Sequence, residues 1–451
     1  PRALYELDQD IRLIIPGYTT SKANAKKLKT IVKFEIDDLD VSLLECRLPG
    51  SEVITWLVDC PVMFERTGGP YLDEDGNEWS DNAERFALFC KAIHLIAMDQ
   101  AGLGWQPEIV HCNDWQTGLV PVLLSQEPIR PFTVFTIHNL AYQGIFSYES
   151  FVALELPSHL WHHDALEFHG LLSFIKGGLV YADRITTVSP RYAEEIQTPE
   201  FGYGLSGLLQ HRSDVLSGIL NGIDTNEWDP GTDPRLFKNY DQVTLDDKLI
   251  NKSKLQGKFN LPEKGESLLI GFIGRLVEQK GIDVILQSLR ELIELPIQFA
   301  LLGSGQRQYE EALLSLVESH PDKISIVIGY NEELAHQIEA GVDVFLMPSR
   351  FEPCGLNQLY SLRYGTLPIV TNVGGLSDSV IDTTAQTIKD RTATGIVIQG
   401  DSAQDLIDAV NRSVTLFQDK DQWREIMTNA MQQDFSWQHS AQQYLTLYNT
   451  L

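Results

Sequence analysis

Two cations lie beside glycines in the second half of the chain, directly after the apolar run 267–274. Arg275 follows this run at once, and Lys280 precedes Gly281 at the start of an amphipathic segment. Arginine and lysine neutralise the charge of a diphosphate, and the N–H groups at a helix N-terminus receive its oxygens. The spacing therefore indicates a diphosphate site, although two surface cations flanking a helix start would look the same.

A second set of candidate residues lies in two glycine-bearing loops, after the apolar runs VDVFL and LPIVT. Glu352 could accept hydrogen bonds from sugar hydroxyls, and the amides of Gly355, Gly374 and Gly375 could meet phosphate oxygens. Taken alone, a carboxylate in such a loop is more often a helix N-cap or a solvated charge. Cys354 is interpreted as a small packing residue in preference to a reactive thiol.

The first half of the chain places polar residues and one aromatic ring after two strand-like runs. They are His111, Asn113, Asp114 and Trp115 after the first run, and His138 and Asn139 after the second. A sugar pocket needs paired hydrogen-bonding groups for neighbouring hydroxyls and a flat apolar face for the ring. Each residue singly is more often structural, but the set at successive strand ends favours a sugar site.

The elements that must position these residues show an alternating pattern. From about residue 264, short apolar runs alternate with amphipathic segments, which is typical of a parallel sheet covered on both faces. The first half repeats the pattern less regularly, with strands predicted at 11–18, 54–61, 108–114, 132–139 and 184–190. These runs predict two Rossmann-like doubly wound domains, with ligands beyond the carboxyl ends of the strands.

The domain boundaries follow from turn-forming residues. The stretch 217–234 is rich in Gly, Asn, Asp and Pro and is interpreted as the hinge. The predicted domains are residues 1–218 and residues 219–435, facing each other across a cleft. Residues 436–451 are predicted to form a terminal helix with Ser436 as its N-cap.

Composition excludes several classes of function. The chain has 451 residues and a formal net charge of -27, so a nucleic-acid or anionic-membrane partner would be repelled. Its apolar stretches are too short to cross a bilayer, and no signal segment opens it. Five cysteines form no C-x-x-C pair and no ligand spacing with histidine, which argues against zinc and disulfides and fits a reducing compartment.

The segments together resemble a known family across nearly the whole chain. The pieces that carry the resemblance, in order, are HCNDWQTGLVP, TIHNLAYQGIF, KGGLVYADRITTVSPRYAEEI, EFGYGLSGLL, LNGIDTNEWDP, GFIGRLVEQKG, PSRFEPCGLNQLYSLRYGTLPIV and GGLSDSV. This order is similar to that of bacterial glycogen synthases and plant or cyanobacterial starch synthases. That family consists of ADP-glucose-dependent glycosyltransferases of the two-domain GT-B architecture.

The resemblance implies roles for matching residues. Arg275 and Lys280 would bind the donor diphosphate and stabilise the leaving group, and Glu352 would contact the donor glucose. His138 would lie beside the anomeric carbon. The other positions expected to bind substrate are Asp114, Trp115, Asn139, Asn221, Tyr330 (against the adenine ring), Cys354, Gly355, Leu356, Gly374 and Gly375. The helix 436–451 would pack back on the first domain.

The activity implied is retaining transfer of glucose from ADP-glucose to the non-reducing end of an α-1,4-glucan. No second carboxylate suggests a double displacement, so front-face attack by the acceptor 4-hydroxyl is expected. No metal and no cofactor are expected, because ADP-glucose is itself the donor substrate. The expected location is the cytoplasm or the plastid stroma, with association with starch granules left open, as is the choice between starch and glycogen.

One departure from the family and three rival functions remain open at this stage. Family members begin with a strand and a K-x-G-G-L loop that this sequence lacks, and omission of that segment from the sequence is expected rather than its true loss. True loss would favour a non-catalytic glucan-binding homologue. A UDP-glucose-dependent transferase is a second alternative. A nicotinamide-dependent dehydrogenase is disfavoured because no G-x-G-x-x-G fingerprint follows the first predicted strand.

Overall fold

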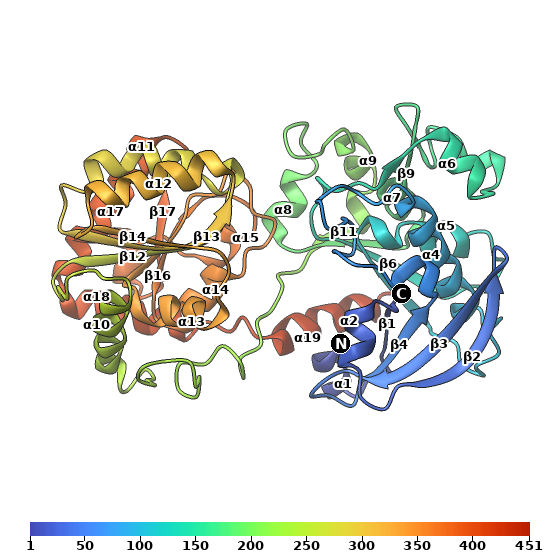
Figure 1. Cartoon of the computed structure of the whole chain (residues 1–451), viewed down its shortest axis with the longest axis horizontal. Coiled ribbons are helices and arrows are strands. Elements are labelled where there is room, and N and C mark those ends of the chain that lie inside the picture. Colours follow the sequence, from blue (N-terminus) through green and yellow to red (C-terminus); the bar gives the residue numbers. More distant parts are fainter. The chain divides into compact units, whose positions relative to one another are not determined.

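The computed structural model describes all 451 residues, and the chain divides into two compact units (Figure 1). The first unit contains residues 1–188, 193–219 and 441–451, and the second contains residues 189–192 and 220–440. The domain boundaries predicted after residues 218 and 435 lie close to the ends of these units, and they remain predictions. No helix in the structure combines the length and apolar composition that crossing a membrane requires.

The second unit is built on a six-stranded sheet in which all neighbouring strands are parallel. The strand order is β14-β13-β12-β15-β16-β17, which is the order 3-2-1-4-5-6 of doubly wound nucleotide-binding folds. The strands are β12 (Leu268–Leu276), β13 (Ile297–Gly305), β14 (Ile324–Ile328), β15 (Val344–Met347), β16 (Leu367–Thr371) and β17 (Ile396–Ile398).

Helices cover both faces of this sheet. They are α10 (Lys248–Lys258), α11 (Ile282–Leu292), α12 (Arg307–Ser319), α13 (Glu332–Gly341), α14 (Asn357–Arg363), α15 (Gly374–Ser379), α16 (Ala385–Lys389), α17 (Ala403–Gln418) and α18 (Lys420–Met431). Figure 1 shows α11, α12 and α17 on one face and α10 and α13 on the other. Three of the amphipathic segments expected after about residue 264 are confirmed as helices by α11, α12 and α13.

Alternate residues of each strand enter two separate cores, as the two-residue period of a strand requires. In β12, Leu268 and Ile270 join the core beneath α11 and α17, whereas Leu269 joins the core that includes Leu255 of α10 and Ile338 of α13. A strand that is buried on both faces must be apolar throughout, which is why these segments appear as continuous apolar runs in the sequence.

The first unit contains two four-stranded sheets and a small antiparallel one. The wholly parallel sheet has the order β11-β10-β6-β5, from β11 (Leu216–Gly218), β10 (Arg184–Thr187), β6 (Phe132–Ile137) and β5 (Ile109–Asn113). The second has the order β1-β4-β3-β2, from β1 (Arg12–Pro16), β4 (Ile54–Asp59), β3 (Leu39–Arg47) and β2 (Lys29–Ile36). The small sheet joins β7 (Ile145–Phe146), β9 (Leu171–Ser173) and β8 (Glu167–Phe168).

The helices of the first unit are short, except for one. They are α1 (Arg2–Glu6), α2 (Thr19–Asn24), α3 (Pro61–Phe64), α4 (Asn82–Ala97), α5 (Leu119–Leu124), α6 (Tyr148–Ala153), α7 (Phe174–Tyr181) and α9 (Ser206–His211). Helix α8 (Pro190–Glu195) begins in the second unit and ends in the first. The longest, α4, is almost wholly buried.

An antiparallel hairpin in the first unit departs from the predicted run of parallel strands. Strands β2 and β3 pair antiparallel, and β3 also pairs antiparallel with β4. Asp37 and Asp38 between them both have positive φ, at 53° and 59°. Two central residues with positive φ form the turn type that matches the twist of paired strands, so the Asp-Asp pair closes the hairpin.

Helix α19 (Trp437–Tyr448) returns the chain to the first unit, to which residues 441–451 belong. The backbone N–H of His439 donates to the Ser436 hydroxyl at 3.3 Å, which confirms Ser436 as the predicted cap. Within the first unit Ala441 packs with Ala3 and Leu4 of α1. The Tyr448 hydroxyl lies 2.6 Å from His111 Nδ1, so the helix is also fastened to β5.

Asp183 lies just before β10 and links the start of this strand to the start of the neighbouring strand β6. Its carboxylate accepts two hydrogen bonds from Arg130 (2.7 and 2.9 Å) and two from the backbone N–H and hydroxyl of Thr133 (2.7 and 2.9 Å). Burial alone would raise the pKa of Asp183, but the hydrogen bonds from Arg130 and Thr133 outweigh it and the pKa lies below its ordinary value. The ionised carboxylate therefore stabilises the fold.

Replacing Asp183 with asparagine is expected to lower the free energy of unfolding by about 2 kcal/mol at neutral pH, because Arg130 loses a charged partner. A lowered carboxyl pKa contributes stability above the unfolded value and loses it as the pH falls through the folded value. The difference between wild type and variant should thus shrink below about pH 4. Urea titrations between pH 7 and pH 3 measure it, with exposed Asp75→Asn as the control; a difference constant over that range contradicts the prediction.

Candidate functional site

The first unit contributes a polar group at the ends of β5 and β6, which are adjacent parallel strands. Asp114 follows β5, and its Oδ1 accepts a hydrogen bond from the backbone N–H of His138 at 2.8 Å. His138 follows β6, and its Nε2 lies 2.9 Å from Asn113 Oδ1. An amide oxygen can only accept, so the imidazole donates through Nε2 and its ring is held in one orientation.

The backbone of Asp114 is unusual, with φ at 56°. Its N–H donates to the Thr136 carbonyl at 2.9 Å, which holds the residue in place against the neighbouring strand. Burial raises the pKa of the Asp114 carboxyl, although His138 and the backbone N–H groups of His138 and Asn139 act in the opposite direction. Positive φ in a non-glycine residue costs energy and is retained most often at functional sites.

Two residues of this group make contacts within the first unit. Trp115 is 9% exposed, and its ring packs on Phe86 with centroids 4.9 Å apart. A methyl group on Gly144 would lie 2.4 Å from that ring. Trp115 therefore packs within the first unit, and its role as a platform for a sugar ring stays a prediction. Asn139 accepts from the N–H of Ala141 at 3.0 Å and so shapes the turn after β6.

His111 is structural as well. Its Nε2 lies 2.6 Å from the hydroxyl of Thr136, and its Nδ1 lies 2.6 Å from the hydroxyl of Tyr448. Burial lowers the pKa of His111 to about 3, so the ring is neutral at physiological pH. Its place in the sequence motif reflects the attachment of α19.

The second unit brings together three loops at the carboxyl ends of β12, β15 and β16. Strand β12 is flanked by β13 and β15, and the direction of the strand order reverses between β12 and β15. Ligands of doubly wound sheets bind at such a reversal. Arg275 is the second-last residue of β12, so the strand extends past the apolar run 267–274; Lys280 follows β12, Glu352 follows β15, and the glycine pair Gly374–Gly375 follows β16.

Lys280 and Glu352 form the central pair of this edge. Lys280 Nζ is ion-paired with Glu352 Oε2, which also accepts from the Ser349 hydroxyl at 3.1 Å. The Glu352 residue is 8% exposed. Arg275 is exposed and reaches Gln279 Oε1 at 3.5 Å, so its guanidinium points to solvent with little to hold it. One cation and one buried carboxylate, Lys280 and Glu352, therefore meet where the strand order reverses, and Arg275 lies at the carboxyl end of β12 at the same edge.

Glycines allow the three loops to touch backbone to backbone. Gly281 caps α11 with φ at 71°, and a methyl group there would lie 2.1 Å from the Pro348 carbonyl oxygen. A methyl group on Gly374 would lie 2.0 Å from the Glu352 carbonyl oxygen, and one on Gly375 would lie 2.1 Å from that of Cys354. No residue with a side chain fits these positions without moving the loops.

The remaining predicted residues of the second unit differ in exposure. Cys354 is 6% exposed, and burial raises the pKa of its thiol to about 12, with a partial opposing effect from the Asn221 backbone. This agrees with the packing role expected for the thiol and places Asn221 beside it. Leu356 is 39% exposed and follows Gly355, whose φ is 72°. Tyr330 is 83% exposed, and its hydroxyl donates to Glu332.

Several residues outside the predicted set help to hold this edge. Ser349 donates to Glu352, and the Asn357 side chain donates to the Ile273 carbonyl of β12 at 3.0 Å. Arg350 forms a two-bond ion pair with Asp283 of α11, at 2.7 and 2.6 Å. The sequence feature that could have identified these three residues is their place in the run PSRFEPCGLNQ. Which of their side chains turns inward depends on contacts with strand β12 and helix α11.

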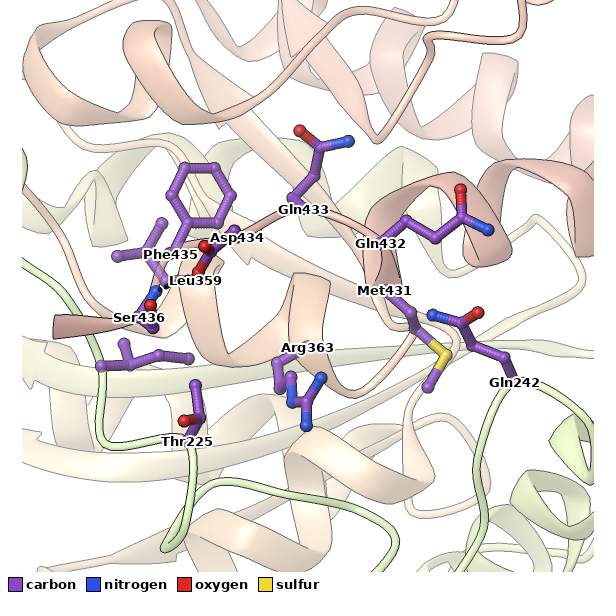
Figure 2. Close-up of a pocket in the computed structure, with 11 residues that line it drawn as sticks. Thr225, Gln242, Leu359, Arg363, Met431, Gln432, Gln433, Asp434, Phe435 and Ser436 are labelled. Atoms are coloured by element: carbon purple, nitrogen blue, oxygen red, sulfur yellow. Dashed lines mark hydrogen bonds between the residues drawn. The ribbon is translucent and has the colours of Figure 1, made fainter. Parts of the chain in front are cut away.

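Two cavities of the second unit lie away from these loops. A cavity of about 450 Å³ is bounded by residues of the segment 431–436 and by Arg363, which is paired with Asp229 at 3.0 Å (Figure 2). A second, of about 530 Å³, lies beside α16 and α17. None of the predicted site residues lines either cavity, so the candidate site is defined by converging loops.

Comparison with known proteins identifies relatives of this chain. Residues 1–211 match the family described as the starch synthase catalytic domain, and residues 253–430 match glycosyl transferases group 1. Glycogen synthase of Cellvibrio japonicus is 52% identical over 100% of this chain and 94% of that protein. Glycogen synthase 1 of Methylococcus capsulatus is 51% identical over 99% of this chain and 91% of that protein.

The chain belongs to the glycogen synthase family. The catalytic domain of starch synthase IV from Arabidopsis thaliana, bound to ADP and acarbose, is 30% identical, with a TM-score of 0.88 over 99% of this chain and 93% of that one. Sucrose-phosphate synthase from Thermosynechococcus elongatus, at 18% identity and a TM-score of 0.58, shares the fold over 100% of this chain and 90% of that one. The predicted GT-B architecture is confirmed, and the protein is a glucosyltransferase that elongates a glucan.

Proposed function

We propose that this glycogen synthase family member transfers glucose from ADP-glucose to the non-reducing end of an α-1,4-glucan with retention of configuration. The observation that supports it most is the Lys280–Glu352 pair beside Arg275, at the reversal of strand order. The neighbouring Gly374 and Gly375 amides are expected to face phosphate oxygens of the same donor. The Arabidopsis starch synthase with ADP bound has the same architecture over nearly the whole chain.

The physical demands of the reaction agree with these residues. Negative charge grows on the departing diphosphate as the bond to the anomeric carbon breaks, so fixed cations stabilise the transition state more than the ground state. Arg275 and Lys280 supply those cations, and Glu352 is proposed to accept hydrogen bonds from the donor glucose. The adenine ring is proposed to lie on the exposed ring of Tyr330.

The first unit is proposed to hold the sugar that reacts. The orientation of His138 is fixed by Asn113, and the Asp114 carboxylate is fixed by the His138 backbone. Both groups can then act on the sugar without reorganising. Their interaction energy is therefore available to stabilise the transition state. Asn139, near the turn after β6, is proposed to contact the sugar as well, as is Asn221, which belongs to the second unit. The acceptor 4-hydroxyl is proposed to attack the face that the diphosphate leaves.

The donor distinguishes this proposal from its rivals. Radiolabelled ADP-glucose and UDP-glucose are supplied separately with glycogen as acceptor, and incorporation into polymer is measured. Incorporation from ADP-glucose at least about tenfold above that from UDP-glucose is expected, a difference of roughly 1.4 kcal/mol in transition-state binding. Preference for UDP-glucose would favour the second transferase alternative, and incorporation from neither donor would favour the non-catalytic glucan-binding homologue.

A further inference from the structure

Three side chains of the second unit, outside the proposed reaction, converge near the start of α13. Glu332 and His336 lie one helical turn apart on α13, and Glu227 lies in the segment that follows residue 220. One ligand atom of each, two carboxylate oxygens and one imidazole nitrogen, lies within 4.8 Å of the other two. Neither the glucan acceptor nor the donor sugar, as proposed above, uses these groups.

His336 is the decisive member of this group because it is fully buried yet incompletely bonded. The residue is 0% exposed, and its ring stacks on Trp228 with centroids 3.7 Å apart and planes at 12°. Nδ1 lies 2.7 Å from Asp233 Oδ2, and a carboxylate accepts, so Nδ1 carries the hydrogen in that bond. In the neutral ring Nε2 then presents a lone pair, and it has no hydrogen-bond partner.

The lone pair of Nε2 faces the two glutamates. Glu332 Oε1 lies 3.5 Å from Nε2, too far and of the wrong polarity to satisfy an acceptor. A buried polar atom without a partner is rare and calls for an explanation, such as a bound ion. A histidine that ligates a metal usually donates its other ring N–H to a carboxylate, which is the arrangement of Asp233 and His336.

We infer that Glu227, Glu332 and His336 form a binding site for one divalent cation of borderline softness, with Zn²⁺ as the representative ion. One imidazole nitrogen with carboxylate oxygens suits such a cation better than Mg²⁺ or Ca²⁺, which favour oxygen ligands alone. The ion ties the first turn of α13 to the segment that contains Glu227. The site is therefore structural, and it stabilises the second unit.

Two existing contacts of the glutamates set the strength of the site. Glu227 Oε1 is ion-paired with Arg235 Nη2 at 3.2 Å, and the Tyr330 hydroxyl donates to Glu332 Oε2. The side chains of Glu227 and Glu332 are 47% and 43% exposed, so both can turn toward a cation. Arg235 competes with the cation for Glu227, and Arg235→Gln is expected to tighten binding.

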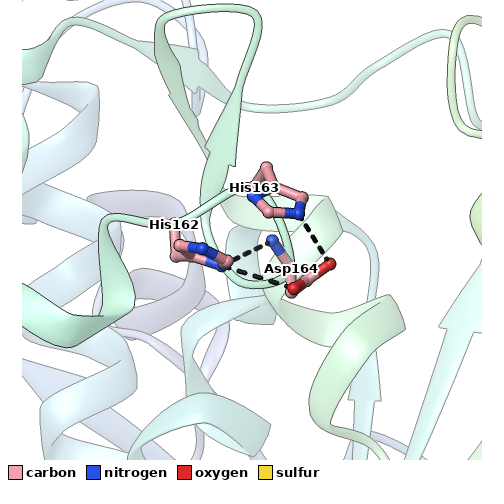
Figure 3. Close-up of side chains that lie close together, drawn as sticks. All are labelled: His162, His163 and Asp164. Carbon is pink, nitrogen blue, oxygen red and sulfur yellow. Dashed lines mark hydrogen bonds and ion pairs between the residues drawn. The ribbon is translucent and has the colours of Figure 1, made fainter.

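A second cluster of possible metal ligands must be eliminated before metal binding to this site is measured. His162, His163 and Asp164 lie together in the first unit, and all three are exposed (Figure 3). Asp164 is already ion-paired with both rings, at 3.4 and 3.3 Å, and no buried ligand faces the group. It is not proposed as a site, but its imidazoles could take up Zn²⁺ weakly. The five cysteines are buried and do not compete.

The test uses the full chain with the exposed histidines replaced, His162→Gln and His163→Gln, after dialysis against a chelator. Calorimetric titration with Zn²⁺ is expected to show one ion per chain and a rise in the Tm of unfolding. Glu332→Gln and Glu227→Gln are each expected to weaken Zn²⁺ binding by at least about tenfold. Glu333→Gln, the next residue of α13 with a side chain 63% exposed, is the matched control and should bind as the parent does.

Either of two results with Zn²⁺, or one result with Co²⁺, would overturn the inference. The first is absence of Zn²⁺ binding by the parent, which would leave Nε2 to an ordered water. The second is equal binding by Glu332→Gln, Glu227→Gln and Glu333→Gln. Co²⁺ in place of Zn²⁺ gives an independent reading, because its visible absorption reports ligand geometry without reference to folding or to glucan synthesis. A Co²⁺ spectrum unchanged in Glu332→Gln would count against the site as well.

Discussion

Replacing Lys280 with alanine is expected to lower kcat/KM for ADP-glucose by at least about 100-fold, roughly 2.7 kcal/mol of transition-state stabilisation. The cation neutralises charge that develops on the diphosphate only as the glycosidic bond breaks, so most of the loss should appear in kcat. Steady-state rates of glucose incorporation into glycogen measure it. The exposed residue Lys389 provides the control, and Lys389→Ala should leave both kcat and kcat/KM unchanged.

The ion pair with Glu352 offers a competing explanation that a double mutant resolves. Alanine at position 280 also leaves the Glu352 carboxylate, which is 8% exposed, without its cation. If that were the whole effect, Lys280→Ala would lower the free energy of unfolding, and adding Glu352→Gln would restore it. A loss of less than about tenfold in the single variant, roughly 1.4 kcal/mol, would refute the leaving-group role of Lys280.

Alanine at Gly281 is expected to damage stability and activity together. The added methyl group would lie 2.1 Å from the Pro348 carbonyl oxygen, and φ of 71° is unfavourable for any residue with a Cβ. Relief requires movement of the loop after β15 or of the start of α11. The free energy of unfolding should fall by about 2–4 kcal/mol, and because Lys280 precedes this position the rate should fall at least about tenfold.

The matched control for this variant is Gly207, in helix α9. Nothing lies within 4 Å of a methyl group there, and its φ is not positive. Gly207→Ala should be neutral or should stabilise by up to about 1 kcal/mol, as alanine does in an exposed helix. Denaturant unfolding and incorporation rates measured on both variants decide the matter. The packing described here would be contradicted by a Gly281→Ala protein that has the same free energy of unfolding as the wild type and keeps full activity.

The doubly wound sheet of the second unit could be predicted because its signal is local. Strands buried on both faces must be apolar throughout, so β12 and β13 appear as short apolar runs between amphipathic helices. Arg275 and Lys280 can then be predicted from position alone, since Arg275 lies at the carboxyl end of β12 and Lys280 comes shortly after it. Their convergence with Glu352 needed the strand order, which no single segment contains.

Other features depended on contacts between distant residues and could not be predicted. The β2–β3 hairpin lacks an Asn-Gly or Asp-Gly turn, and its Asp37-Asp38 pair carries positive φ only because the strands demand it. The burial of Trp115 against the rings of Phe86, Phe146 and Phe174 is a second example. The burial of an aromatic side chain is a tertiary property, and its neighbours come from three separate segments.

The return of residues 441–451 to the first unit has a consequence for how the protein is made. A ribosome releases the chain from its N-terminus, and domains generally begin to fold in that order. Here the first unit must wait for residues 441–451, which emerge after the whole of the second unit has been translated. Until then Ala3, Leu4 and His111 lack their partners, so the half of the molecule that is synthesised first is the half that is completed last.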